Sequence, residues 1–446
     1  MPSYDAFDLK YTSREITAWG GLAILKRMMD GMGLREAIQS WDFPEPRSNR
    51  GYAPVQLVEQ MIVSIWCGAA RFVHADITRL DSTLTRLFDW PRAAGHKAIV
   101  RLFQRFDQSA ANRLQTSSYS WLFGKLNLNP ITLDVDSTVM TRWGNKQEGA
   151  NKGYNPKNHG RNSHHPLLAF VADWRLVANL WLRPGSSHTA NNALAFLEAT
   201  LENLGHTKVG LFRADSGFYD KAIMGWLAGK RISHIISAKL TTALQQAILE
   251  QCRWQAVTDG IQVSELLYQP HGWDKVMRFV VVRQHIQRKD GVAGKTLSLF
   301  ANDPDLQGWR YGAMVTDLTL PSLDVWRLYR GRADCENRIK ELKADFGLDS
   351  FILRDFWATE AALGVAMLSY NLMSVFRHAV LRQKVHHTLA TLHHKVLAVG
   401  AYWDKPNEDT KPSIRLAIAK KRRPWFEGLW ANAGEPVQLN PATYKV

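Results

Sequence analysis

The feature that most constrains the fold is a change in the spacing of apolar residues near Pro130. Over residues 13–120, apolar side chains recur every three or four positions, which is the period of an amphipathic helix. From Ile131 to Met140, apolar and polar side chains alternate, which is the period of a β-strand. The sequence therefore predicts a helical region followed by a fold that combines strands and helices.

The order of the segments after this change predicts a mixed sheet. Three strand-like segments come first, and three consecutive strands are expected to form an antiparallel meander. Strands that then alternate with helices are expected to add parallel pairing. The segments are, in order, strands at 131–140, 165–173 and 175–184, a helix at 191–204, a strand at 208–215, a helix at 219–229 and a strand at 232–240.

Residues 240–320 return to β character and form a β-rich block ahead of another helix. The strand-like segments of this block lie at 261–269, 278–286, 296–301 and 311–318. A helix is then expected from Ser322 to Phe346, with Gly347 as its stop signal. The apolar run at 361–376 is too short to span a membrane and includes polar residues, so we expect a buried helix.

The chain is strongly basic, with 56 Lys and Arg against 41 Asp and Glu and a net charge of +15. Such an excess attracts polyanions, of which nucleic acid is the most common. The amphipathic helix at 95–108 places Lys97, Arg101 and Arg105 at four-residue steps. It is either a DNA-facing helix or a core helix with a solvated basic face.

Five regions are therefore predicted, of which the first is expected to bind DNA. They are a helical DNA-binding region at 1–125, the first part of an α/β core at 126–239, a β-rich insertion at 240–320, a core helix within 321–350, and a helical C-terminal region with a basic tail at 351–446. The three cysteines are far apart and give neither a disulfide framework nor a zinc finger. With no signal-peptide pattern at the start, a reducing cytoplasm is the expected compartment.

Three acidic side chains are the candidate chemical groups: Asp136 on the polar side of its strand, Asp215 at a strand end, and Glu336 on the 322–346 helix. A lone aspartate at a strand end is usually a turn former or a helix cap. A glutamate on a charged helix usually pairs with neighbours such as Arg332 and Lys340. Three carboxylates that converge on one point would instead need cations between them, and hard oxygen ligands suit two Mg²⁺ or Mn²⁺ ions. Such a pair of ions, about 3.5–4 Å apart, supports phosphoryl transfer.

The segment at 329–343, YRGRADCENRIKELK, resembles the signature of the family-four superfamily of insertion-sequence transposases. That signature has Tyr, two residues, Arg, three residues, Glu, six residues and Lys, and its positions fall on Tyr329, Arg332, Glu336 and Lys343. The stretches LDVDSTV and RADSGFYD resemble the motifs that carry the first and second aspartates. The stretch at 153–170 looks most like that of the thirteen-eighty relatives. The resemblance covers residues 130–350 well and the flanking parts only loosely.

The resemblance implies an RNase H-like mixed sheet with flanking helices and a β-rich insertion before the glutamate helix. It implies that Asp136, Asp215 and Glu336 bind the metal ions and catalyse the reaction. It also implies contacts to transposon-end DNA from Tyr329, Arg332 and Lys343, with Lys340 in the same basic row. A tryptophan of the insertion would stack on a base turned out of the helix. Trp309 is the first candidate for it, with Trp273 and Trp326 as alternatives.

Two ambiguities remain at the level of sequence. Asp134 shares a strand face with Asp136 and is either a ligand or a supporting residue, although the Asp-Ser-Thr pattern favours Asp136. The His-rich stretch at 155–165 holds the ligand types of a zinc site in His159, His164 and His165, but it lacks a fourth ligand at a typical spacing. We expect instead a basic hairpin near DNA, with Lys157 and Arg161 at phosphates.

The sequence thus predicts a DNA transposase that cleaves transposon ends in a metal-dependent reaction and transfers the strands into target DNA. The expected partners are double-stranded DNA, as terminal inverted repeats and target, and a second copy of the chain in a homodimer. The expected place is the bacterial nucleoid. One alternative is a catalytically silent DNA-binding derivative or regulator with the same fold, and another is a host nuclease without a joining step.

Overall fold

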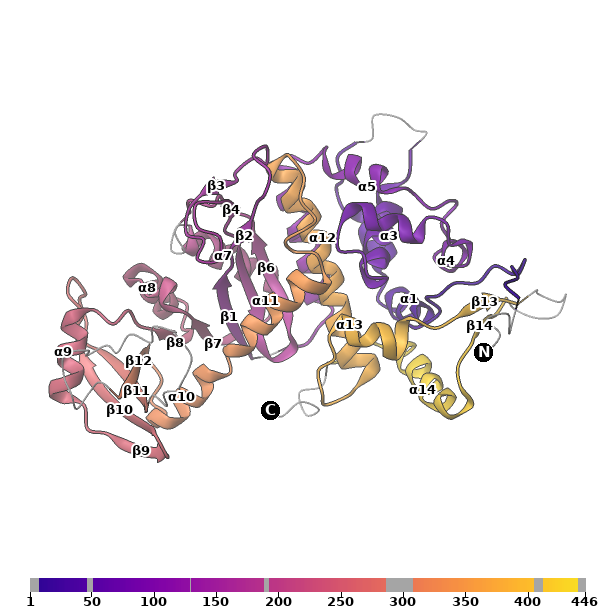
Figure 1. Cartoon of the computed structure of the whole chain (residues 1–446). Coiled ribbons are helices and arrows are strands. Elements are labelled where there is room, and N and C mark those ends of the chain that lie inside the picture. The colour runs from indigo at the N-terminus through magenta and orange to yellow at the C-terminus, as the bar shows by residue number, and fades with distance from the viewer. Residues whose placement is uncertain are drawn as a thin grey trace, which may run out of the picture. The chain divides into compact units, whose positions relative to one another are not determined.

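The computed structural model describes residues 8–45, 51–128, 130–187, 192–285, 308–404 and 412–439. The chain divides into two compact units (Figure 1). Unit 1 comprises residues 1–127, 146–148 and 341–446, and unit 2 comprises residues 128–145 and 149–340.

Unit 1 is mostly helical. Its central helix α12 (Phe356–Val375) is buried from Ala358 to Val375, and the Trp66 indole nitrogen on α3 donates to the Ser369 carbonyl at 3.3 Å. The apolar run at 361–376 is therefore a buried helix, as its composition predicts. Within the described ranges, no helix is both long and apolar enough to cross a membrane.

The other elements of unit 1 are mainly short helices, with one small hairpin of two strands. They are α1 (Leu22–Gly31), α2 (Leu34–Ser40), α3 (Pro54–Trp66), η1 (Phe72–Thr78), α4 (Ser82–Leu87), α5 (His96–Phe103), α6 (Gln108–Gly124), η4 (Phe376–Leu381), α13 (Leu389–Leu392), η5 (His393–Leu397), β13 (Ala401–Trp403), β14 (Ile414–Leu416), η6 (Lys420–Arg422) and α14 (Arg423–Ala433). On α5, Lys97 and Arg101 are exposed while Ile99 and Leu102 are buried, so the basic residues lie on the solvent side of an amphipathic helix.

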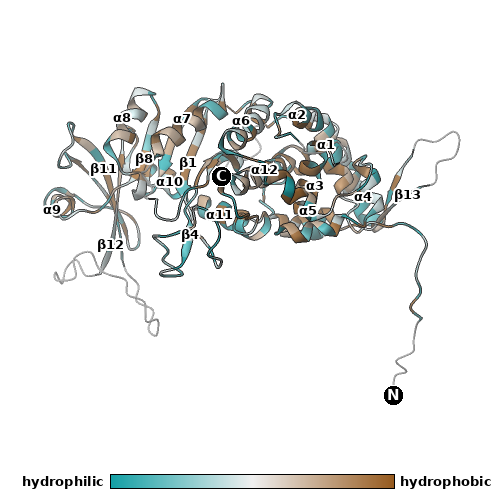
Figure 2. Cartoon of the chain, turned by 90° about the horizontal axis from the view of Figure 1, so that it is seen from above, coloured by the Kyte–Doolittle hydropathy of each residue, from teal (hydrophilic) through white to brown (hydrophobic). Residues whose placement is uncertain are grey.

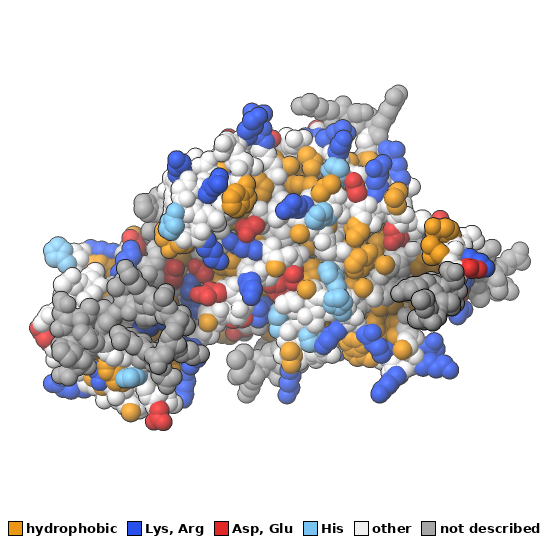
Figure 3. All heavy atoms as spheres, viewed as in Figure 1, with side chains coloured by type: hydrophobic (Ala, Val, Ile, Leu, Met, Phe, Trp, Pro, Cys, Tyr) orange, Lys and Arg blue, Asp and Glu red, His pale blue; other side chains and the backbone are white. Residues whose placement is uncertain are grey.

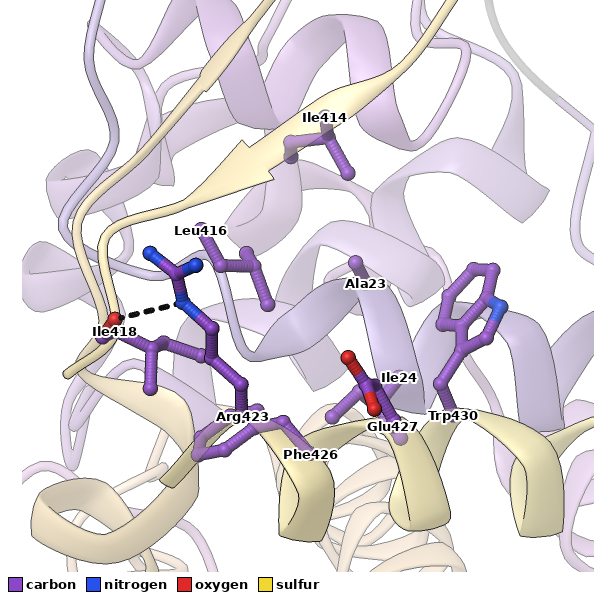
Figure 4. Close-up of a pocket in the computed structure, with 9 residues that line it drawn as sticks. All are labelled: Ala23, Ile24, Ile414, Leu416, Ile418, Arg423, Phe426, Glu427 and Trp430. Carbon is purple, nitrogen blue, oxygen red and sulfur yellow. Dashed lines mark hydrogen bonds between the residues drawn. The ribbon is translucent and has the colours of Figure 1, made fainter. Parts of the chain in front are cut away.

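A pocket in unit 1 lies between α1, β14 and α14 (Figure 4). Its lining is largely apolar, and Arg423 and Glu427 are its charged members. The Arg423 Nε atom donates to the Ile418 carbonyl at 3.4 Å. On its rim the half-exposed Trp430 lies under the Arg27 guanidinium, 4.3 Å from the ring centroid. The lining offers no cluster of carboxylates or nucleophiles, so we assign no chemistry to it.

Unit 2 is built on one large sheet. Among the described residues, nine strands join in the order β6-β5-β1-β7-β8-β12-β11-β10-β9. The strands are β1 (Ile131–Ser137), β5 (Leu167–Val171), β6 (Leu176–Trp181), β7 (Val209–Ala214), β8 (Ser233–Ser237), β9 (Gln255–Thr258), β10 (Ile261–Tyr268), β11 (Met277–His285) and β12 (Trp309–Thr316). The helices are η2 (Ala172–Trp174), α7 (Ala193–Leu204), η3 (Ser216–Phe218), α8 (Lys221–Gly229), α9 (Thr242–Gln251), α10 (Ser322–Arg330) and α11 (Ala333–Asp345), of which the last continues into unit 1.

The first five strands of this sheet form the predicted RNase H-like arrangement. β1, β5 and β6 pair antiparallel, which confirms the meander. β7 and β8 then add on the other side of β1 in parallel, each reached through a helix. The fold class predicted from the sequence, a mixed sheet with flanking helices, is confirmed.

The β-rich block continues the same sheet, because β12 pairs antiparallel with β8. Its apolar core includes Ile235, Val263 and Val280 on the strands and Trp326 on α10. The block opens with helix α9, which strand periodicity did not predict. Thr241 starts this helix by accepting a hydrogen bond from the Leu244 amide. The strand predicted at 296–301 lies outside the described residues.

A second, small sheet projects from the core between β1 and β5. It has the order β2-β4-β3 and comprises β2 (Met140–Thr141), β3 (Asn151–Lys152) and β4 (Asn162–His164). Figure 2 shows this lobe coloured hydrophilic, whereas strands of the large sheet carry hydrophobic colour.

Candidate active site

The two candidate aspartates lie at the ends of neighbouring parallel strands. The register of β1 and β7 pairs Asp134 with Arg213 and Val135 with Ala214, so the next position on each strand is Asp136 and Asp215. Neighbouring strands are about 4.8 Å apart. The two carboxylates therefore emerge side by side at one edge of the sheet, as expected for strand ends.

Asp136 is buried, and its ion-pair partner is the Arg332 guanidinium. Its Oδ1 atom accepts a hydrogen bond from the Ser137 amide at 2.8 Å and lies 3.2 Å from Nη2 of Arg332. Burial, assisted by the carboxylates of Asp215 and Glu336, raises the pKa of Asp136 from 3.8 to about 6, although Arg332 opposes the shift. The charges of Asp215 and Glu336 thus act on the Asp136 carboxylate.

Asp215 lies between the end of β7 and the start of the short helix η3. Its Oδ1 atom accepts a hydrogen bond from the Gly217 amide at 2.9 Å, which caps the short helix η3. This contact fixes the carboxylate at the strand end while the residue stays partly exposed. Asp215 is therefore both a cap and a group that solvent and ligands can reach.

Glu336 lies in the first turn of α11 and is exposed. The single helix predicted from Ser322 to Phe346 is in fact two helices, since α10 ends at Arg330 and α11 starts at Ala333. A Cβ on Gly331 would lie 2.7 Å from Nη1 of Arg213, so the glycine permits the guanidinium to approach the backbone here. Because the helix is interrupted between Arg330 and Ala333, the residues from Tyr329 to Lys343 do not lie on one continuous helix.

An ion-pair network fastens α11 to the sheet. Asp134 is fully buried, and its two oxygens accept from Nε and Nη2 of Arg213 at 2.7 and 3.0 Å. Arg338 on α11 reaches the same carboxylate at 3.2 Å and also donates to Asp334 at 3.0 Å. Asp334 accepts in turn from Arg175 at 2.7 Å. The polar face predicted for β1 is therefore buried, and Asp134 is occupied by two guanidinium groups.

Arg332 and Tyr329 lie within the same cluster of charges. Burial of Arg332 lowers the pKa of its guanidinium, but the neighbouring groups, of which the Asp136 carboxylate acts most strongly, together outweigh burial and raise it. Burial raises the pKa of the partly buried Tyr329, which also hydrogen-bonds to Ser237 on β8. Their closest described partners are thus protein groups around Asp136.

The remaining predicted DNA contacts fall in several places. Lys340 is exposed on α11, and Lys343 is half-buried and 3.5 Å from the Asp349 carboxylate. Trp309 begins β12 and lies under the Arg283 guanidinium, 4.5 Å from the ring centroid.

The two alternative tryptophans differ in exposure. Trp273 is half-buried and stacks on Tyr219, with ring centroids 5.2 Å apart. Trp326 is buried in the core of the β-rich block. Packing therefore makes Trp326 the least accessible of the three tryptophans to a DNA base.

The His-rich stretch forms part of the small lobe. Lys157 and Arg161 are exposed there. His164 accepts from Nε of Arg142 at 2.9 Å, and the His165 ring is 3.0 Å from the Ser137 hydroxyl. The side chains of His164 and His165 thus contact other protein groups, which argues against the hypothesis of a zinc site.

The donor chemistry of the candidate site fits a hard divalent cation. Asp136 and Asp215 lie at the ends of neighbouring strands, and the charges of Asp215 and Glu336 add to the burial that raises the pKa of Asp136. In the described parts of the chain, no three acidic, His or Cys side chains lie close enough together to hold a metal ion as they stand. Asp136, Asp215 and Glu336 would therefore have to draw together around an ion.

Comparisons with known proteins complete the description. A family model described as "Transposase DDE domain group 1" matches residues 3–423. A search of curated proteins found no significant match. The chain is also similar to a chain of a solved structure titled "Cryo-EM structure of piggyBac transposase synaptic complex with hairpin DNA", at 9% identity and a TM-score of 0.45, over 86% of this chain and 81% of that one.

Proposed function

Because the chain belongs to the group 1 family of DDE transposases and is therefore a DNA transposase, we propose that Asp136, Asp215 and Glu336 are its catalytic carboxylates. The observation that carries the proposal is the register of β1 and β7, which sets Asp136 and Asp215 side by side. The raised pKa of Asp136, caused by burial and by the other two carboxylates, supports their convergence. The reaction is cleavage at transposon ends followed by strand transfer into target DNA.

The three carboxylates would hold two divalent ions, Mg²⁺ or Mn²⁺. When bound, such ions activate a water or a 3′-hydroxyl and stabilise the leaving oxygen of an in-line displacement. The protein's own part is to fix the ligands, which it does with the Ser137 amide at Asp136 and the Gly217 amide at Asp215. The ion pairs of Arg338 hold the helix that bears Glu336.

Arg332 is proposed to orient Asp136, on the strength of their 3.2 Å ion pair. The resemblance to the transposase family also implies that Arg332 contacts DNA. Experiment can distinguish a DNA contact from the orientation of Asp136. Loss of a phosphate contact would weaken DNA binding and flatten its salt dependence. Loss of orientation would slow cleavage without changing the salt dependence, and the buried ion pair leads us to expect this second result for Arg332→Ala.

DNA binding is proposed to use the exposed cations Lys340, Lys157 and Arg161 at phosphates. DNA contacts by Lys343 and Tyr329 and the base-stacking role of Trp309 are proposed by resemblance to the family-four transposases. The active form is proposed to be a homodimer that joins two terminal inverted repeats. The helical region at 1–125 is proposed to read those ends, with Lys97 and Arg101 on its exposed surface.

The test uses purified protein and a plasmid that carries the gene with its native flanks. Strand breaks are mapped with Mg²⁺ or Mn²⁺, with EDTA, and with Asp215→Ala and Glu336→Gln. Cleavage is expected to fall by roughly a thousandfold or more in both variants, because a lost metal ligand removes several kcal/mol of transition-state stabilisation. Binding to the ends should persist, since neither residue is a phosphate contact.

A matched control is Asp274→Asn, an exposed aspartate of unit 2 that pairs with Lys221. It should cut like the wild type. Cleavage by Asp215→Ala at the wild-type rate would refute the assignment of the carboxylates. Binding without cutting by the wild type under every metal would favour the silent DNA-binding derivative.

A further inference from the structure

The lobe formed by β2, β4 and β3 has a composition unlike that of the sheet it projects from. Residues 138–165 include five Lys and Arg but one acidic residue, Glu148. The lobe leaves the sheet directly after Asp136, because β1 ends at Ser137 and β2 begins at Met140. Figure 3 shows Lys and Arg side chains next to hydrophobic ones over the surface where β3 and β4 lie. A strongly basic surface thus begins a few residues from a proposed catalytic carboxylate.

Buried polar contacts hold the lobe in one conformation. Arg142 is buried and donates to His164 across the β2–β4 pair. Asn155 is also buried, donates to the Thr141 hydroxyl at 3.0 Å and accepts from the Asn158 amide at 3.1 Å. The loop that follows β3 is therefore fastened to β2 rather than free to reorganise.

This fastened frame exposes two large aromatic rings. Trp143 is 71% exposed and Tyr154 is 70% exposed. Trp143 directly follows the buried Arg142, so the backbone that anchors one side chain presents the other to solvent. The Arg161 guanidinium lies over the Trp143 ring, 5.0 Å from its centroid. A tryptophan this exposed contributes little to packing, and the arginine holds its ring in place through a cation–π contact.

We propose that Trp143 and Arg161 form a stacking platform for an unpaired base of DNA, with Lys157 at an adjacent phosphate. Flat aromatic rings bind bases of any sequence through their π faces, and neighbouring cations follow the backbone. The excess of cations over acids in the lobe selects a polyanion as the partner. The inference rests on the proposed function in one respect, namely that the substrate is DNA.

The experiment measures the anisotropy of fluorescein-labelled oligonucleotides without metal. One probe is oligothymidine of about 16 nucleotides, the upper end of a site of this type, and the other is an abasic strand of the same length. Trp143→Ala is expected to weaken binding to oligothymidine on the order of tenfold. It should leave binding to the abasic strand unchanged, and Trp143→Phe should keep most of the affinity.

The salt dependence separates stacking from charge. Trp143→Ala should not change the slope of log K against log salt concentration, whereas Lys157→Ala should reduce it by about 0.7. The matched control is Trp430→Ala, which removes another exposed tryptophan under an arginine, in unit 1. It is expected to bind both probes like the wild type.

Equal behaviour of Trp143→Ala on the two probes, whether both are weakened or neither is, would overturn the proposal. A thermal unfolding curve of Trp143→Ala that matches the wild type would show that any loss is not one of folding. The assay contains no metal and needs no cleavage, so its failure leaves the proposed catalytic carboxylates untouched. Conversely, loss of cleavage in Asp215→Ala does not bear on the platform.

Discussion

Asp134 and Asp136 lie two positions apart on β1, yet two guanidinium groups pair with the first carboxylate and one pairs with the second. The register of β1 and β7 explains the difference, because it pairs Asp134 with Arg213 and leaves Asp136 beside Asp215. A step of two residues along both strands thus replaces a cation with an anion. Arg338 completes the neutralisation of Asp134 from α11. Both residues are aspartates, so the difference between them comes from the residue that lies opposite each one on the neighbouring strand. Arg213 opposite Asp134 gives that carboxylate a role in the fold, whereas Asp215 beside Asp136 is a second candidate ligand.

The largest expected effect on stability comes from Asp134→Asn. The change removes the anion that pairs with Arg213 and one of the two that pair with Arg338, and breaking a buried ion pair costs about 3–5 kcal/mol. Urea unfolding at neutral pH measures the free energy of unfolding. A loss below about 1 kcal/mol, the range of exposed pairs, would contradict the structural role of Asp134.

The same substitution at Asp136 should have the opposite sign. The pKa of Asp136 is raised from 3.8 to about 6 in the folded state by burial and the two other carboxylates. The folded protein therefore binds this proton more tightly than the unfolded chain, so the contribution is fully present below pH 3.8 and is lost as pH rises through about 6.

In metal-free buffer, the free energy of unfolding should thus fall by about 3 kcal/mol at most across that window. Asp136→Asn should remove this fall and exceed the wild type in stability at neutral pH. Urea unfolding of both proteins from acid to neutral pH measures the difference. A variant less stable than the wild type at neutral pH would break the contrast between the two aspartates.

A smaller effect, on activity, is expected from Asp334→Asn. Asp334 lies two residues before Glu336 and receives Arg338 and Arg175, so its loss loosens the helix that bears the glutamate. Groups that orient metal ligands typically account for about 10- to 100-fold in metal affinity or activity. The variant should need more Mg²⁺ for half-maximal cleavage, and Asp334→Glu should restore part of the loss. An unchanged metal requirement would make Asp334 a purely structural residue.

The smallest effect is expected from Asp274→Asn. Asp274 and Lys221 form an exposed pair at 2.9 Å, and exposed pairs are worth about 0–1 kcal/mol. Urea unfolding should barely distinguish the variant from the wild type. A loss of more than about 1 kcal/mol in the free energy of unfolding would show that this exposed carboxylate also matters for stability.

Much of the fold was predictable because periodicity is a local property. The position of β1 follows from alternation of apolar and polar residues, and those of β5, β6, β7 and β8 follow from short runs rich in apolar residues. Helix α9 was not predictable from periodicity, because it is short and buries only Leu244, Ala247 and Ile248. The close approach of the Arg213 guanidinium to Gly331 was not predictable from local sequence, because Arg213 lies more than a hundred residues away in the chain.

The candidate site was predictable in its members but not in its contacts. Asp136 and Asp215 are recognisable as strand-end aspartates, whereas the assignment of Asp134 to Arg213 and Arg338 depends on register and packing. Arg338 had one local signal, its four-residue distance from Asp334 on a helix. No local signal in the sequence indicated that Trp143 is exposed, because a tryptophan just after a short strand can equally well be buried.

The pairing of β12 with β8 has a consequence for anyone who trims this protein to a minimal catalytic core. β8 would become an edge strand if residues 240–320 were deleted, and its unpaired backbone groups beside buried Ile235 and Ile236 would face solvent. Open apolar edges recruit strands from other molecules and lead to aggregation. The β-rich block thus covers the edge of the sheet that carries Asp136 and Asp215. A shortened enzyme would need a charged residue or a proline on β8 to prevent pairing with other molecules.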